Sequence, residues 1–492
     1  MKARALLPLA FITLLACIAS PEPSIIAPGR HATLVDTITP QLAIATPTIL
    51  QPVTDTAAAP TPSIGSFELI GHTPLLNRGM NAAPAVYGNY AYVGSRTDGR
   101  HEDAGVLVVD ISNPSNPQIV HQIGPPEEGL IGQTSRELRV WPDQELLMVM
   151  NVDCEAILHD CGQPVTPPNI NIYDISGANA AIPKLLVSYP LGRPPHEMFL
   201  WDDSRVPGRA LLYLSIWGRA IDELIVLDIS QARNGSVQEV STWSAPFGAA
   251  RDGLHSLSIS VNGRRAYLAH DKDGFMILDM SDFADAIPNP RVRLLTPPEN
   301  WARSVPGAHS AVKLFGKPYA LITQEVYGLC PWGWAHFIDI TDESRPFFIA
   351  EYKLHPYNTI EFCASRTDDR YRFTSYSTHN PTLTKNLAFI TWHSGGLQAV
   401  SIENPLQPMR VADFLPEPLP SVMTEDPALS SGPDKIVMWS YPIIKDGLIY
   451  VVDIRNGLYI LKYHGPYQDE VGSIRFLEGN SNLGDAQLWE IP

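Results

Sequence analysis

The sequence predicts an all-β fold assembled from a repeated unit of short strands, and three observations support this. Seven apolar, strand-like runs end at corresponding positions, which are Asp110, Asp174, Asp228, Asp279, Asp339, Ser401 and Lys462. The steps between these positions are 64, 54, 51, 60, 62 and 61 residues. The 492 residues are 45% hydrophobic and include 34 Gly and 45 Pro, which suits a large core with many tight turns. A period of this size made of short strands predicts a β-propeller with seven blades.

The first repeat shows the expected order of strands. An opening segment at 81–87 is followed by the run YAYVGS from Tyr90 and the run GVLVVDIS from Gly105. The turn NPSNP then precedes an outer strand that ends at Gly124, because its two prolines interrupt the extended chain. The seven blades are expected at 77–124, 134–192, 195–245, 252–297, 306–356, 374–416 and 435–464.

The seventh repeat has no outer strand of its own directly after residue 464. A run at the other end of the folded region, SFELIG from Ser66 to Gly71, matches the outer strand of the first repeat. We expect this run to complete the seventh blade and close the ring, which removes exposed strand edges. The competing candidate, 471–477, could instead be an added C-terminal strand. The propeller is therefore expected over 65–470, followed by a C-terminal extension at 471–492.

Two of these repeats resemble a known family. The runs GVLVVDISNPSNP and HSGGLQAVSIENPLQP are similar to the LVIVD repeat, a propeller unit of bacterial and archaeal surface proteins. The resemblance covers about 400 residues, although the second and third blades lack the NPxxP turn. It implies a propeller fold and a cell-surface location, and it implies no particular reaction.

The N-terminus has the features of an export signal. Lys2 and Arg4 precede a short apolar stretch, residues 6–16, that is too short to span a bilayer. It ends in Leu-Leu-Ala-Cys17, which resembles the lipobox of bacterial lipoproteins and implies cleavage before Cys17 and lipidation of its thiol. The alternative is an ordinary signal peptide with a chance cysteine. Residues 1–16 are thus expected to be a signal peptide, and 17–64, rich in Pro, Ala and Thr, a disordered tether to a membrane.

The net charge bears on which partners the protein binds, and the cysteine content bears on the compartment in which it resides. The formal net charge is −17, from 35 basic and 52 acidic residues, which disfavours nucleic acid as a partner. Besides Cys17 there are four cysteines, and in an exported protein an even number predicts disulfides, here Cys154–Cys161 and Cys330–Cys363. A zinc site made of these cysteines is disfavoured because no CxxC spacing occurs. We expect a protein exported to the cell surface or the periplasm and anchored by lipid.

Aligning the repeats reveals four histidines in one register, at the start of the innermost strand: His196, His255, His309 and His379. The equivalent positions of the other three blades are near Asn81, Arg136 and Ser440. The starts of these strands meet at one end of the central channel, so the four imidazoles are candidate ligands of iron, copper or zinc. Glu197 and Glu361 are candidate carboxylates for orienting a ligating histidine. The alternatives are that each histidine bonds a neighbouring backbone, or that the group binds a ligand without metal.

The loops between the second and third strands should reach the same end of the channel. They carry imidazoles, carboxylates and indoles that suit a cation, a carbohydrate or a small ligand. The candidates on this ligand face are His101, His270, Glu325, Trp332, Trp392 and His393. The aspartates that close the third strands are expected instead to cap turns.

Two functions fit the sequence. The first is a lipid-anchored binding module for a protein, a glycan or a small ligand, and the second is a metal-dependent enzyme, such as an oxidoreductase, that uses the four histidines. No GxSxG, P-loop or GxGxxG motif points to another chemistry. A metal site predicts that the four Nε2 atoms lie within ~4 Å of one another.

Overall fold

The computed structural model describes residues 64–124, 131–154, 161–163, 167–217, 222–246, 253–303, 307–326, 330–365, 374–430, 432 and 435–490. The chain divides into two units, Met1–Ala57 and Ala58–Pro492, and every described residue belongs to the second. The expected signal peptide, Cys17 and nearly all of the expected tether therefore lie outside the described residues.

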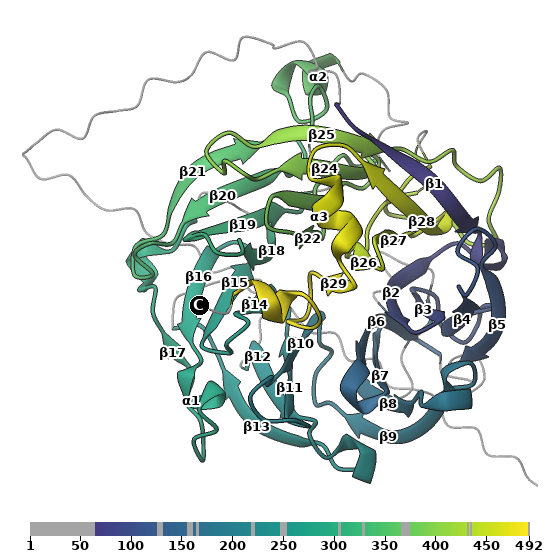
Figure 1. The fold of residues 1–492 in the computed structure, drawn as a ribbon, viewed down its shortest axis with the longest axis horizontal. Helices are drawn as coiled ribbons and strands as arrows, with labels where there is room; N and C mark the ends of the chain where they lie inside the picture. The colour runs from purple at the N-terminus through teal and green to yellow at the C-terminus, as the bar shows by residue number, and fades with distance from the viewer. Residues whose placement is uncertain are drawn as a thin grey trace, which may run out of the picture. The chain divides into compact units, whose positions relative to one another are not determined.

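The first repeat is an antiparallel meander of four strands. It comprises β2 (Asn81–Tyr87), β3 (Tyr90–Ser95), β4 (Val106–Asp110) and β5 (Gln118–Ile123). Each strand pairs with the next along the chain. Figure 1 shows the sheets of this unit arranged around a common centre, with the first strand of the repeat, such as β6 (Gln133–Trp141), β10 (Glu197–Asp202) or β14 (Leu254–Ile259), toward the inside. This radial arrangement of antiparallel sheets is that of a β-propeller.

The same strand order recurs along the chain. The second and third repeats contain β6 (Gln133–Trp141), β7 (Leu146–Asp153), β8 (Asn169–Asp174), β9 (Lys184–Pro190), β10 (Glu197–Asp202), β11 (Ala210–Ser215), β12 (Leu224–Asp228) and β13 (Gln238–Trp243). The next three contain β14 (Leu254–Ile259), β15 (Arg265–His270), β16 (Gly274–Asp279), β17 (Arg293–Leu294), β18 (Ala308–Lys313), β19 (Tyr319–Gln324), β20 (Ala335–Asp339), β21 (Phe347–Tyr352), β22 (Pro381–Leu383), β23 (Leu387–Thr391), β24 (Leu397–Ser401) and β25 (Met409–Phe414). The first two repeats are joined in one sheet through the single pair Ser95↔Ser135.

The last sheet combines strands from both ends of the described chain. Its own strands are β26 (Ile443–Lys445), β27 (Leu448–Asp453) and β28 (Gly457–His464). The strand β1 (Ser66–Thr73) pairs antiparallel with β28 on the outer side, from Ser66↔His464 to Thr73↔Leu458. On the inner side β29 (Phe476–Glu478) pairs with β26, so the C-terminal extension contributes an added strand.

Helices are few and short. The α-helices are α1 (Ser281–Ala284), α2 (Ile360–Ser365), α3 (Gln468–Ser473) and α4 (Ala486–Trp489). The 3-10 turns are η1 (Leu75–Asn77), η2 (Pro142–Gln144), η3 (Gly177–Ala180), η4 (Ala232–Asn234) and η5 (Pro298–Asn300). Within the part of the chain that the structure describes, no helix is long and apolar enough to cross a membrane.

The inner strands of the repeats are buried on both faces because neighbouring sheets pack against each other, whereas outer strands such as β5 and β9 are partly exposed. Val106 to Val109 of β4 are all buried, and Asp110 at the strand end is half-buried. Its carboxylate accepts a hydrogen bond from the Ser112 amide at 2.8 Å. The same contact, from a carboxylate to an amide two residues on, recurs at Asp174, Asp228, Asp279 and Asp339. The predicted turn-capping role of these aspartates is confirmed.

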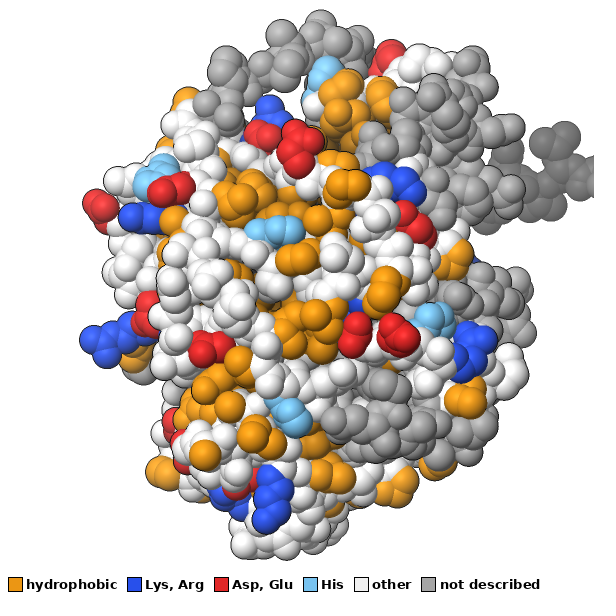
Figure 2. Space-filling model, turned by 90° about the vertical axis from the view of Figure 1, so that its right-hand side faces the viewer, with side chains coloured by type: hydrophobic (Ala, Val, Ile, Leu, Met, Phe, Trp, Pro, Cys, Tyr) orange, Lys and Arg blue, Asp and Glu red, His pale blue; other side chains and the backbone are white. Residues whose placement is uncertain are grey.

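Both predicted disulfides are present, with Cα–Cα distances of 6.0 Å for Cys154–Cys161 and 5.5 Å for Cys330–Cys363. Disulfides persist in oxidising compartments, so they support an extracytoplasmic location. On the side of the molecule seen in Figure 2, acidic and basic side chains are scattered among hydrophobic and uncharged ones.

Candidate metal centre at the inner ends of the repeats

Local strand geometry explains how the four histidines come to one place. His196 directly precedes β10, and its amide bonds the Ser215 carbonyl at 2.7 Å. In β14 the strand register shifts between Leu254 and Ser256, so His255 sits in a β-bulge, and His309 occupies the same position in β18. Bulges re-aim a side chain relative to the flat sheet and are common beside functional sites.

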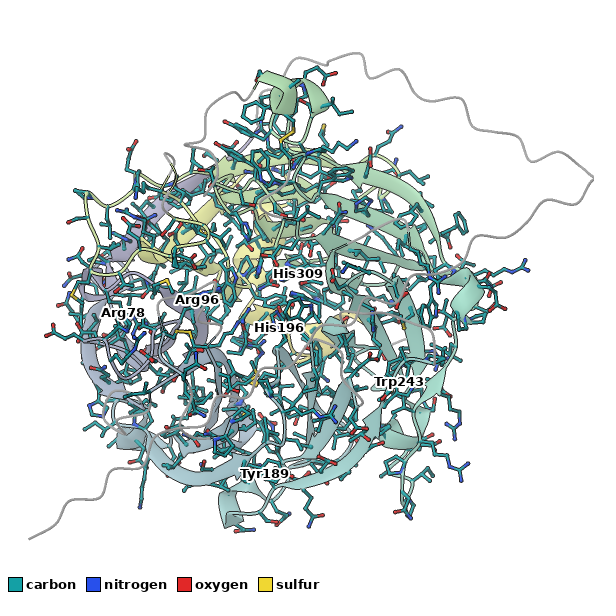
Figure 3. All side chains as sticks on the ribbon, turned by 180° about the vertical axis from the view of Figure 1, so that it is seen from behind. Arg78, Arg96, Tyr189, His196, Trp243 and His309 are labelled. Carbon is teal, nitrogen blue, oxygen red and sulfur yellow. A yellow bond between two sulfur atoms is a disulfide. The ribbon has the colours of Figure 1, made fainter. Side chains whose placement is uncertain are left out.

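The four imidazoles form a continuous row. The ring centroids of His196 and His255 lie 4.1 Å apart, those of His255 and His309 4.1 Å, and those of His309 and His379 3.9 Å. A fifth ring, His393, follows at 5.2 Å from His379. Figure 3 shows His196 and His309 near the centre of the fold, whereas Tyr189 and Trp243 lie on its outer strands. The alignment of the repeats therefore brought together residues that do meet in space.

Glu325, directly after β19, faces most of this row. Its carboxylate oxygens lie 3.3 Å from His393 Nε2, 3.6 Å from His379 Nε2, 3.8 Å from His309 Nε2 and 3.9 Å from His255 Nε2. On the other side, Glu197 Oε1 lies 3.8 Å from His309 Nε2. The Glu325 carboxylate thus reaches imidazoles from three successive repeats and, at His393, from a loop.

Two sets of ligand atoms are close enough to hold a cation. They are Glu197, His255 and His309, and His309, Glu325 and His379, and within each set the atoms lie within 4.8 Å of one another. Neutral imidazole and carboxylate are ligands of zinc, iron and copper, at bond lengths of about 2.0–2.2 Å for zinc. His309 is common to both sets, so it is the residue on which metal binding should depend most.

Hydrogen bonds at the second ring nitrogen leave Nε2 available. His379 Nδ1 lies 2.8 Å from the Trp439 carbonyl oxygen, and His309 Nδ1 lies 2.8 Å from Ser310 Oγ. Partners of this kind fix the orientation of ligating histidines in metal proteins.

Burial sets the protonation of the histidines. It lowers the pKa of His196, His309 and His379 well below the ordinary value, and it lowers the pKa of His255 to about 4. At neutral pH the imidazoles are therefore uncharged, which is the form that binds metal.

The two carboxylates differ in protonation. Burial alone would raise the pKa of Glu325, but the hydrogen bond from His393 and the neighbouring histidines lower it to about 2. Burial and the charge of Glu137 instead raise the pKa of Glu197 to about 8. Glu197 Oε2 accepts hydrogen bonds from Ser256 Oγ at 2.6 Å and from the Tyr441 hydroxyl at 3.1 Å. The site thus combines an ionised and a protonated carboxyl group.

Not every predicted ligand joins these sets. His196 is half-buried, and its Nε2 lies 3.4 Å from Arg136 Nη2, outside both sets of ligand atoms. Glu197 does lie against His309, as expected of a supporting carboxylate, but it is close enough to be a ligand itself. Glu361 lies exposed on α2, and no contact joins it to the described histidines of the row. The side chains of the described residues that are close enough to hold a cation are therefore three histidines and two glutamates, and His196 and Glu361 are not among them.

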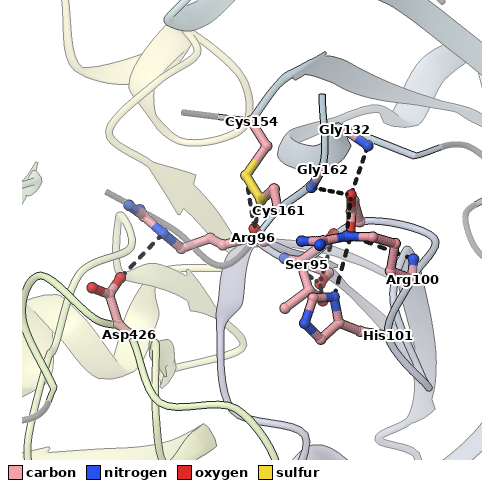
Figure 4. Close-up of a disulfide and its surroundings, with 11 residues drawn as sticks. Ser95, Arg96, Arg100, His101, Gly132, Cys154, Cys161, Gly162 and Asp426 are labelled. Carbon is pink, nitrogen blue, oxygen red and sulfur yellow. Dashed lines mark hydrogen bonds and ion pairs between the residues drawn. A yellow bond between two sulfur atoms is a disulfide. The ribbon is translucent and has the colours of Figure 1, made fainter. Parts of the chain in front are cut away.

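Of the candidates predicted for the ligand face, some lie in the histidine row and others do not. Glu325 and His393 belong to the row, whereas His270 is fully buried between Glu223 and Asp273, at 3.6 Å from each carboxylate. His101 lies 3.2 Å from Asp98, near the disulfide of Figure 4. Trp332 and Trp392 are packed in the core, and Trp392 Nε1 donates to the Tyr376 carbonyl at 2.7 Å. The expectation that these two indoles line a ligand face is not met, because aromatic burial between repeats is more favourable.

This fold and site define an all-β repeat protein of the propeller class with a buried histidine and glutamate cluster. The family described as the LVIVD repeat matches residues 81–123 and 255–287, so the chain carries LVIVD repeats at these two places; the run GVLVVDISNPSNP lies in the first, whereas HSGGLQAVSIENPLQP lies outside both. The second match contains His255 itself.

Two solved structures are similar in fold. The periplasmic gluconolactonase of Pseudomonas aeruginosa is 15% identical, with a TM-score of 0.47, and the match covers 76% of this chain and 95% of that one. The computationally designed Ika8 protein is 10% identical, with a TM-score of 0.44, and the match covers 80% of this chain and 99% of that one. No protein of curated function matches the sequence.

Proposed function

We propose that this protein is a lipid-anchored, extracytoplasmic β-propeller that binds a transition-metal ion at the histidine end of its channel. The observation that carries the proposal is the position of the Glu325 carboxylate, within 3.9 Å of the Nε2 atoms of His255, His309 and His379. The side chains come from three consecutive repeats and are largely buried. Burying several ionisable groups together is costly unless they are paired or bind a cation, which argues for a ligand rather than a merely structural repeat.

The architecture on which the site depends is a ring of seven blades closed by β1. Seven sets of strands in the same order support this count, with β1 as the outer strand of the set that contains β26, β27 and β28. The pairing of β1 with β28 joins residues near the two ends of the described chain in one sheet. The lipid anchor is supported by the sequence around Cys17, and export by the two disulfides.

The ligand atoms limit which metal the site would take. Imidazole nitrogen and carboxylate oxygen without thiolate suit zinc, iron or copper more than calcium or magnesium, which prefer oxygen alone. Such an ion would act as a Lewis acid, and iron or copper would add redox chemistry.

A second candidate function, a metal-dependent enzyme, is favoured by Glu197. Its carboxyl group touches the same His309, and its pKa is raised by burial to about 8. A protonated carboxyl group beside a metal position is placed to give or take a proton near neutral pH. The binding of a protein or a glycan on the same face would be a further use of the module.

The test is a calorimetric titration of Zn²⁺ into the mature chain, freed of metal by a chelator. Wild type should bind Zn²⁺ with a defined stoichiometry, and His309→Ala should bind at least ~100-fold more weakly, since it removes a ligand of both sets. His121→Ala, which alters a histidine on the outer strand β5, is the matched control and should match wild type. Equal binding by His309→Ala and wild type, or no binding by wild type, would refute the proposal.

A further inference from the structure

The repeats that lack a histidine contribute a different group to the same end of the channel. Trp439, just before Ser440, has two guanidinium groups over its ring, with Arg96 Cζ at 5.1 Å and Arg136 Cζ at 5.8 Å from the centroid. Arg96 directly follows β3, and Arg136 lies in a bulge of β6. We name Arg96, Arg136 and Trp439 the arginine group. It comes from the first, second and last repeats.

The arginine group is contiguous with the histidine row. Arg136 Nη2 lies 3.4 Å from His196 Nε2 at one end of the row. At the other end the Trp439 ring lies 5.0 Å from the ring of His379, and its carbonyl oxygen bonds His379 Nδ1. Figure 3 shows Arg96 and His196 near the centre, with Arg78 further out in the first repeat. A ligand of a few atoms could therefore touch both groups.

The positive charges of Arg96 and Arg136 have different partners. Arg96 forms an ion pair with Asp426 at 3.8 Å, and its main-chain carbonyl lies beside the Cys154–Cys161 sulfurs (Figure 4). Arg136 is half-buried, and among the described residues its hydrogen-bond partner is the neutral imidazole of His196. The adjacent Glu137 pairs instead with Arg139, at 3.0 Å.

Arg136 therefore presents a positive charge that no described carboxylate contacts, and its buried Nε has no hydrogen-bond partner. A guanidinium recognises carboxylate and phosphate groups through two parallel hydrogen bonds. The cation–π contact with the Trp439 ring, at 5.8 Å from Arg136 Cζ to the centroid, restrains the guanidinium, and its fork of donors suits two parallel hydrogen bonds better than a lysine does.

From this geometry we infer that Arg136, supported by Trp439, binds the oxyanion of a small ligand, a carboxylate or a phosphate, beside the metal position. The inference rests on the proposed function for the neighbouring ion and adds the ligand class that the site would take. The anion contact would thus come from the second and last repeats, whereas the four aligned histidines come from the third to sixth.

The experiment measures acetate and inorganic phosphate binding to the mature chain by calorimetry, with and without Zn²⁺. At least one of the two should bind wild type, and Arg136→Gln should weaken that binding by ~10-fold or more because it removes a charged donor pair. Arg136→Lys, which keeps the charge, should recover part of it. The control Arg233→Gln removes an exposed arginine paired with Asp174 and should match wild type.

Each outcome separates the two proposals. Binding of acetate alone assigns a carboxylate, and binding of phosphate alone assigns a phosphate. Anion binding that depends on Arg136 without any Zn²⁺ binding supports the anion site and refutes the metal site. Zn²⁺ binding without anion binding, or anion binding that Arg136→Gln leaves unchanged in a protein with the wild-type Tm, overturns the anion site.

Discussion

The Nδ1 atom of His379 lies 2.8 Å from the main-chain carbonyl oxygen of Trp439 in the next repeat. A carbonyl oxygen only accepts, so Nδ1 carries the proton and Nε2 carries the lone pair. That Nε2 faces Glu325 Oε1 at 3.6 Å. One hydrogen bond therefore selects the tautomer that can bind a metal and links the histidine row to the arginine group.

Removing the ionised carboxylate should weaken metal binding. Glu325→Gln keeps the size of the side chain but loses the negative charge that faces four imidazoles. We expect Zn²⁺ affinity to fall by ~100-fold, the upper end of the loss in metal affinity that follows when a residue supporting a ligand is removed. Calorimetry measures this, with Glu417→Gln, an exposed glutamate, as the control. An unchanged affinity would exclude Glu325 as a ligand.

Acid should destabilise the metal-free protein through the histidines. Burial lowers the pKa of His255 to about 4, against 6.5 for an ordinary histidine, so below pH 6.5 the unfolded state binds protons that the folded state does not. The contribution of the histidines to stability should therefore be complete above pH 6.5 and should fall by about 1.4 kcal/mol per pH unit for each such histidine as pH drops toward 4.

Denaturant unfolding between pH 4.5 and 7.5 measures this loss. His255→Gln should show a smaller slope than wild type, because one buried histidine no longer titrates. His121→Gln, in β5, should keep the wild-type slope. Identical slopes for wild type and His255→Gln would contradict the prediction.

Glu197 should make the folded protein less stable as pH rises, the opposite of the effect of the histidines. Its pKa is raised to about 8 in the folded protein, so the folded state holds a proton that the unfolded state releases above pH 4.5. Stability should fall by up to about 1.4 kcal/mol per pH unit between pH 6.5 and 8, where the histidines no longer contribute. Glu197→Gln should abolish this slope in the same unfolding measurements, whereas Glu417→Gln should retain it. A slope that survives Glu197→Gln would assign it to another group.

The contact of β1 with the first repeat offers a test of ring closure. A Cβ atom at Gly71 would lie 1.9 Å from the Pro114 carbonyl oxygen, in the turn between β4 and β5. Gly71→Val should therefore lower the free energy of unfolding by about 1–3 kcal/mol through overpacking. Gly192→Val, where a Cβ meets nothing within 4 Å, is the control. Equal stability of the two variants would show that β1 does not lie against this turn.

The period of the sequence predicted the inner strands well because each blade must place the same buried strand beside the axis. His255 and His309 could be aligned for that reason, and both lie in the row. Glu325 and His393 were assigned only to a ligand face, since loop residues follow no period and their direction depends on neighbouring repeats. The same alignment gave Arg136 as the equivalent of His196 in the preceding repeat, and their side chains, 60 positions apart, lie 3.4 Å from each other.

The misplaced aromatic residues have a simpler cause. Trp332 and Trp392 stand beside polar loops in the sequence, which suggested a ligand face. Their side chains are 1% and 0% exposed, because the space between adjacent repeats accommodates large rings. Glu361, which was expected to orient a ligating histidine, lies exposed on α2.

The pairing of β1 with β28 also delays the folding of β1 until β28 has been synthesised. Ser66 pairs with His464, and the inner partner of Ile443 is Glu478, which is made later still. β1 therefore stays an unpaired edge in the nascent chain until β28 has been made, and a product truncated before β28 keeps that edge exposed. This sheet can form only after His464 and Glu478 have been made, so a chain that stops earlier keeps an unpaired strand that favours aggregation or degradation.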